Sequence, residues 1–85
     1  MLTSIYQQFT HTIKAGGRLR EFNFLRKSKS QAIVYDVDVA DEKGHRYVFG
    51  MQELEGAWKI ASGQVPEWAV PAENELRTAI AEHQS

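Results

Sequence analysis

The sequence predicts an α+β domain in which an antiparallel meander of about five strands, a curled sheet or half-barrel, packs on a C-terminal helix. Turn signals recur every 8–15 residues, and the β-branched and aromatic runs between them are typical of a β-meander. The run 33–40 has a period of two, which indicates a strand with one buried face. After Pro71 the apolar residues recur at helical spacing instead.

The loop at 41–44 fixes the register of two central strands. Gly44 suits the left-handed position of a three-residue hairpin loop with a bulge. That loop sets three pairs opposite each other on one face: Val39 with Tyr47, Val37 with Phe49, and Tyr35 with Met51. Because a slip of one residue would move every side chain to the other face, the match supports this register.

Three further turns complete the meander. A two-residue turn at Glu55-Gly56 sets Met51 opposite Ile60. A two-residue turn at Gly16-Gly17 sets Phe9 opposite Phe24 and Ile13 opposite Arg20. A four-residue loop at 27–30 would set Leu25 opposite Ala32. The predicted strands span residues 5–14, 18–26, 31–40, 45–54 and 57–62.

The start of the chain allows a second interpretation. The apolar residues Leu2, Ile5, Tyr6, Phe9 and Ile13 also fit one face of a helix that would end at Gly16. The alternative architecture is then an N-terminal helix, a four-stranded antiparallel meander and a C-terminal helix. We favour the strand, because Phe-Thr-His-Thr-Ile is a poor helix former and the Gly-Gly turn gives a consistent register.

The C-terminal part predicts one helix over about residues 72–83. Pro66 and Pro71 bracket an extended segment, 67–70, and Pro71 suits the first turn of a helix. Leu76 and Ile80 would lie on the sheet. One short helix cannot cover the whole apolar row of a flat sheet, so we expect the sheet to curl around it.

Size and composition predict a single domain, 1–85. An apolar content of 42% and a charged content of 25% exclude disorder. The absence of cysteine excludes disulfides and thiolate chemistry, and it favours a reducing, cytoplasmic location. No apolar run approaches the ~18 residues of a membrane span, and the first residues lack a signal-peptide pattern, so no membrane association is expected.

The sequence contains no recognisable catalytic set, and we expect neither an enzyme nor a cofactor. His11, His45 and His83 share no metal-ligand spacing, and no serine or aspartate is placed with them in a known pattern. Asp36 and Asp38 share a strand face, but their run does not fit a calcium-binding loop. We therefore predict no catalytic residue and no metal site.

The outer face of the sheet carries the leading hypothesis for function. Polar residues dominate this face, but four apolar residues interrupt them: Leu25, Val34, Val48 and Leu54. A contiguous exposed apolar patch is typical of a binding surface. We therefore predict a small non-enzymatic protein-interaction module that binds a protein partner, or a second copy of itself, through these residues.

Two other hypotheses stay open. The hairpin at 14–29 could bind single-stranded nucleic acid through its basic residues, Lys14, Arg18, Arg20, Arg26, Lys27 and Lys29. The predicted register argues against it, because Phe22 and Phe24 point into the core rather than toward bases. The third hypothesis places a small ligand inside the curled sheet, which requires a cavity with convergent polar groups.

Overall fold

A computed structural model describes residues 8–84 and confirms the five-stranded antiparallel meander with a C-terminal helix. The sheet has the order β1-β2-β3-β4-β5. Its strands are β1 Gln8–Ala15, β2 Arg18–Lys29, β3 Ala32–Ala40, β4 Arg46–Leu54 and β5 Ala57–Gly63. A 3-10 helix, η2, spans Glu67–Ala72, and α1 spans Glu73–Gln84.

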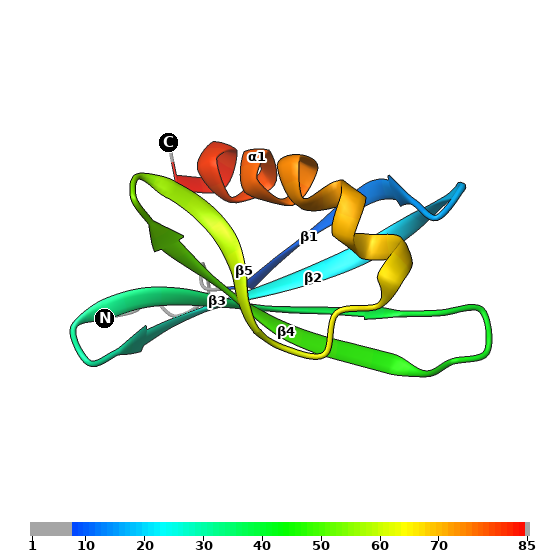
Figure 1. Ribbon diagram of the computed structural model, residues 1–85, viewed down its shortest axis with the longest axis horizontal. Helices are drawn as coiled ribbons and strands as arrows, with labels where there is room; N and C mark the ends of the chain where they lie inside the picture. The colour runs from blue at the N-terminus through cyan, green and yellow to red at the C-terminus, as the bar shows by residue number, and fades with distance from the viewer. Residues whose placement is uncertain (1–7, 85) are drawn as a thin grey trace.

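The sheet curls but does not close, as predicted. In Figure 1, α1 lies across the concave side of the twisted sheet, and β1 and β5 are the two strands nearest to it. The helix contacts β5 and β1, and η2 contacts β1. The helix therefore covers the gap between the two edge strands, and within residues 8–84 no helix covers the convex, outer face of the sheet.

The predicted registers are confirmed at three of the four turns. Phe9 lies opposite Phe24, Tyr35 opposite Met51, and Met51 opposite Ile60. A bulge after Ile60 then re-aligns β5, which ends at Gly63 opposite Phe49. A Cβ at Gly63 would lie 2.6 Å from the Phe49 Cα, and its φ is +91°, so only glycine fits this close approach.

The predicted four-residue loop at 27–30 is wrong. β2 continues to Lys29, and the turn consists of Ser30 and Gln31, with φ of 51° and 67°. Leu25 consequently lies opposite Asp36 instead of Ala32. Two consecutive residues with left-handed backbone form the two-residue turn that hairpins favour. This turn lets the β2–β3 ladder extend to Lys29 and Ala32, and the added pairing offsets the strain of non-glycine residues at these two positions.

Two other predictions need correction. Residues 8–15 form a strand, so the helical alternative is wrong there, while residues 2–7 lie outside the described residues. The segment 67–70 belongs to the 3-10 helix and is not extended. The Ala69 N–H donates to the Pro66 carbonyl at 2.9 Å, which closes the first turn. Pro71 therefore lies inside η2, and α1 begins at Glu73.

The core fills the space between the concave face and α1. Its largest fully buried side chains come from β2, β3, β4 and α1: Tyr35, Phe22, Phe24, Phe49, Met51, Leu76, Ile80, Val37 and Val39. Trp58 is also buried and meets the Tyr35 ring edge to face, with 5.1 Å between the ring centroids. The predicted inner face is thus the core of the domain.

Candidate functional site

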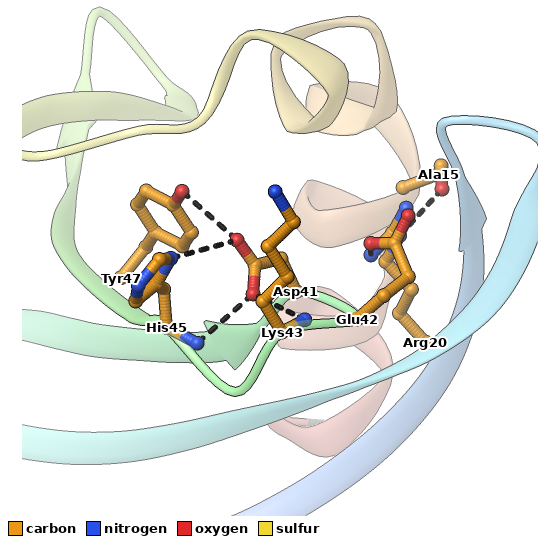
Figure 2. Close-up of polar contacts among 7 residues, drawn as sticks. All are labelled: Ala15, Arg20, Asp41, Glu42, Lys43, His45 and Tyr47. Carbon is orange, nitrogen blue, oxygen red and sulfur yellow. Dashed lines mark hydrogen bonds and ion pairs between the residues drawn. The ribbon is translucent and has the colours of Figure 1, made fainter.

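A buried arginine links three elements at one end of the sheet. Arg20 is only 8% exposed. Its Nε donates to the Ala15 carbonyl at 2.7 Å, and its NH1 donates to Glu42 Oε1 at 3.2 Å. Its guanidinium also lies 3.7 Å from the centroid of the Trp68 ring. Arg20 therefore joins the end of β1 to the β3–β4 loop (Figure 2), and its contact with Trp68 extends the link to η2.

The neighbouring Asp41 organises the β3–β4 loop. Its Oδ1 accepts the backbone N–H of Lys43 and of His45, each at 2.9 Å. Its Oδ2 accepts the Tyr47 hydroxyl at 3.2 Å and lies 3.4 Å from His45 Nδ1 (Figure 2). These contacts hold the three-residue loop that the sequence predicted, so every acceptor direction of this carboxylate serves the loop itself.

The pKa shifts of Asp41 and Tyr47 agree with this structural role. Partial desolvation acts to raise the pKa of Asp41, but the hydrogen bonds from His45, Lys43 and Tyr47 outweigh it and lower the pKa below 3.8. The pKa of Tyr47 is raised by desolvation and by the Asp41 charge. Within residues 8–84, no group of three or more His, Cys, Asp or Glu side chains could hold a metal ion.

The four outer-face residues differ in their exposure and in their cross-strand neighbours. Val48 and Leu54 are 50% and 43% exposed, and Leu25 and Val34 are half-buried. None of the four lies opposite another. Leu25 faces Gln8 and Asp36, Val34 faces Lys27 and Gln52, Val48 faces Asp38, and Leu54 faces Ala57.

Polar contacts run across the outer face between these residues. Thr10 Oγ1 donates to Asn23, and the Asn23 amide donates to Asp38 Oδ1 at 2.9 Å. Arg46 donates to the same oxygen at 2.6 Å. A second ion pair joins Lys27 and Asp36 at 2.7 Å. The outer face is therefore a mixed surface that carries both apolar side chains and ion pairs.

The basic set at 14–29 is divided between two faces. By strand alternation, Arg18, Arg20 and Arg26 have the parity of the inner face, and Lys14 and Lys27 that of the outer face. Arg20 is buried and Lys27 is paired with Asp36. The adjacent phenylalanines of β2 are 0% and 1% exposed, so the described residues present no aromatic surface for base stacking at this hairpin.

The two edges of the sheet differ in a way that the sequence analysis missed. On β5, the Ile60 N–H donates to Glu73 Oε2 at 2.8 Å, and the Trp58 carbonyl accepts Arg77 Nε at 3.0 Å. Both partners lie on α1. The helix thus satisfies one outward N–H and one outward C=O of this edge strand, which hinders the addition of another strand there.

Among residues 8–84, no side chain caps the edge of β1 in this way. The two-residue turn makes Ala15 and Arg18 a hydrogen-bonded pair, so alternation turns the N–H and C=O groups of Thr10, Thr12 and Lys14 away from β2. Among residues 8–84, no hydrogen bond covers these groups. A meander always leaves its first strand at an edge, which is the signal that could have pointed to this surface.

A groove follows this edge between β1 and α1. Its volume is about 280 Å3. The lining residues come from the two elements alone: His11, Ile13, Asn74, Glu75, Thr78, Ala79 and Glu82. Side chains of a strand added to β1 would alternate between the outer face and this groove.

Comparisons with known proteins identify no relative. No family model matches the chain, and neither a curated protein nor a solved structure matches it. No helix within residues 8–84 is long and apolar enough to cross a membrane. The function is therefore inferred from the geometry of the described residues.

Proposed function

We propose that this domain is a non-enzymatic protein-interaction module that binds an extended segment of a partner protein along the β1 edge. The observation that supports it is the difference between the two sheet edges. Glu73 and Arg77 satisfy the backbone of β5, while the outward N–H and C=O groups of β1 have no partner among the described residues. An uncapped edge is a template for strand addition.

The sequence of β1 lacks the usual protection of an exposed edge. Natural sheets guard edges with proline, bulges or charges. The β1 segment, QFTHTIKA, contains no proline and one lysine, and its pairing with β2 is regular from Gln8 to Ala15. Strand addition would replace water at three residues with main-chain hydrogen bonds worth roughly 0.5–1.5 kcal/mol each. The groove beside α1 then supplies contacts for alternate side chains.

We also propose a cytoplasmic location, on the composition alone. The chain has no cysteine, so it gains nothing from an oxidising compartment. Binding through main-chain hydrogen bonds needs neither a disulfide nor a metal.

The β1 edge is tested with the variant Thr12→Pro. The Thr12 N–H points away from β2, so proline removes an edge donor and leaves the β1–β2 ladder intact. The matched control is Thr12→Ala, which keeps the donor. Peptides are selected on the immobilised domain from a displayed random library long enough to span β1, and then displaced with soluble domain.

The proposal expects wild type and Thr12→Ala to displace the selected peptides and Thr12→Pro to displace them at least about tenfold less well. Circular dichroism checks that all three fold alike. Equal displacement by Thr12→Pro, or a library without enriched binders, would overturn the proposal.

A further inference from the structure

We infer that the segment bound at β1 carries an aspartate or glutamate on the side of the outer sheet face, directly opposite Lys14. This inference rests on the proposed function, because it names the chemistry of the partner for the same edge. Strand alternation along β1 and the charges beside it supply the observations.

Lys14 is placed to meet a bound strand. Its side chain has the parity of the outer face and is exposed, and its N–H and C=O point away from β2. A strand added at β1 would therefore form a main-chain pair with Lys14. The partner residue of that pair would share the outer face with the lysine, since directly opposite residues have Cβ atoms about 5 Å apart on the same face.

The charge of Lys14 is not used within the sheet. Across β2 the lysine faces Leu19, an apolar residue that is 70% exposed. No ion pair joins Lys14 to another of residues 8–84. The nearest carboxylate on the same face of β2 belongs to Glu21, which lies opposite Thr12. An added strand would lie about 5 Å from β1 and about 10 Å from β2, so the lysine sets the charge that the bound segment meets on this face.

The inner side of the bound segment meets different chemistry. Neighbouring residues of a strand point to opposite faces, so the residue next to the acidic one would lie opposite Ile13, which lines the groove. Glu75 lines the same groove, and its lining contains no lysine or arginine. A carboxylate is thus favoured on the outer side and disfavoured on the inner side, where an apolar residue suits the buried Ile13.

A second copy of this chain does not supply the acidic residue through its own β1. The strand reads QFTHTIKA, without aspartate or glutamate. Two paired β1 edges would therefore leave each Lys14 without a carboxylate opposite it. An acidic segment of another protein is the occupant that the charges favour.

The probe is a pair of capped peptides, acetyl-Thr-Thr-Val-Glu-Val-Thr-Thr-amide and the same peptide with lysine in place of glutamate. Their symmetry lets the charged residue pair with Lys14 in either strand direction. Each is titrated at low salt into isotope-labelled wild type, Lys14→Gln and Lys14→Glu, and the amide chemical shifts of β1 are followed by NMR. The matched control is Lys59→Glu, the same charge change at an exposed lysine of β5, the other edge strand.

The expected result is that wild type and Lys59→Glu bind the glutamate peptide at least about threefold more tightly than the lysine peptide. Lys14→Gln should lose this preference, and Lys14→Glu should reverse it. The preference should also shrink at about 1 M salt, where the screening length falls to about 3 Å. Thr12→Pro should weaken both peptides, since both need the β1 edge.

Other outcomes separate the two claims. If wild type binds both peptides equally and Thr12→Pro weakens both, the charge inference is wrong and the proposed function stands. If neither peptide shifts the β1 amides, the inferred partner chemistry is wrong, and the library selection decides the proposed function independently. A preference for glutamate that persists in Lys14→Glu would place the carboxylate elsewhere and overturn the inference.

Discussion

At the scale of single residues, the charged side chains at the turn end of the sheet act as structural links. The buried Arg20 side chain donates a hydrogen bond to the Ala15 carbonyl and lies over the Trp68 ring. The Asp41 carboxylate accepts hydrogen bonds from Lys43, His45 and Tyr47, at its own loop and at the start of β4. These contacts tie the β3–β4 loop to the neighbouring strands.

The lowered pKa of Asp41 predicts an acid-dependent contribution to stability. A carboxyl group whose folded pKa lies below its unfolded value stabilises the fold above the unfolded value, here 3.8, and loses that contribution as the pH falls through the folded pKa. The difference in unfolding midpoint between wild type and Asp41→Asn should therefore be largest near neutral pH and shrink below about pH 4. Urea unfolding across this pH range measures it.

The matched control for Asp41 is Glu67→Gln, an exposed carboxylate of η2 that takes no part in the loop contacts of Asp41. Its midpoint should follow wild type at each pH. A difference between wild type and Asp41→Asn that stays constant from neutral to acid pH would contradict the linkage, because protonation of the carboxylate could then not be its source.

At the scale of elements, the sequence predicted the parts that depend on alternation and on glycine turns. The loop at 41–44 and the turns at 16–17 and 55–56 place apolar residues on one face only in one register, so the pattern could be read directly. The two-residue turn at Ser30 and Gln31 was not predicted, because left-handed residues other than glycine leave no compositional signal. The 3-10 turn at Pro66–Ala69 depends on packing of η2 against β1, which no local pattern encodes.

The candidate site could be predicted only in part for the same reason. Alternation placed Leu25, Val34, Val48 and Leu54 on the outer face correctly. Whether they touch depends on cross-strand neighbours, and the wrong turn at 27–30 moved Leu25 from Ala32 to Asp36. The caps on β5 come from α1, which is distant in sequence, so the contrast between the two edges required the tertiary structure.

The α1 cap predicts a local effect on the β5 edge. Glu73→Ala leaves the Ile60 N–H without its acceptor, since this N–H donates to Glu73 Oε2. We expect faster hydrogen exchange at Ile60 and a loss of roughly 1–2 kcal/mol in unfolding free energy. Glu75→Ala, on the same helix but outside the cap, is the control and should leave exchange at Ile60 unchanged. Unchanged exchange in Glu73→Ala would show that the cap is not needed to protect this edge.

At the scale of the whole molecule, the fold uses α1 twice, which leaves one edge and one face uncovered. The helix covers the concave core and satisfies the β5 edge. The convex face and the β1 edge are then the surfaces open to partners among residues 8–84 (Figure 1). Their chemistry differs: the convex face offers apolar side chains beside ion pairs, and the edge offers outward backbone N–H and C=O groups in a row.

Molar mass in solution separates these two surfaces. A stable homodimer needs roughly 800 Å2 of well-packed surface on each partner, with an apolar centre. Asp36 and Asp38, both in ion pairs, lie between the apolar side chains of the outer face, so we expect the mass of a single chain at micromolar concentration. Val34→Lys and Val48→Lys should then leave both the sedimentation behaviour and peptide binding at β1 unchanged. A concentration-dependent dimer that either substitution splits would instead assign the interaction surface to the outer face, because neither residue lies on the β1 edge and neither change alters the groove beside α1.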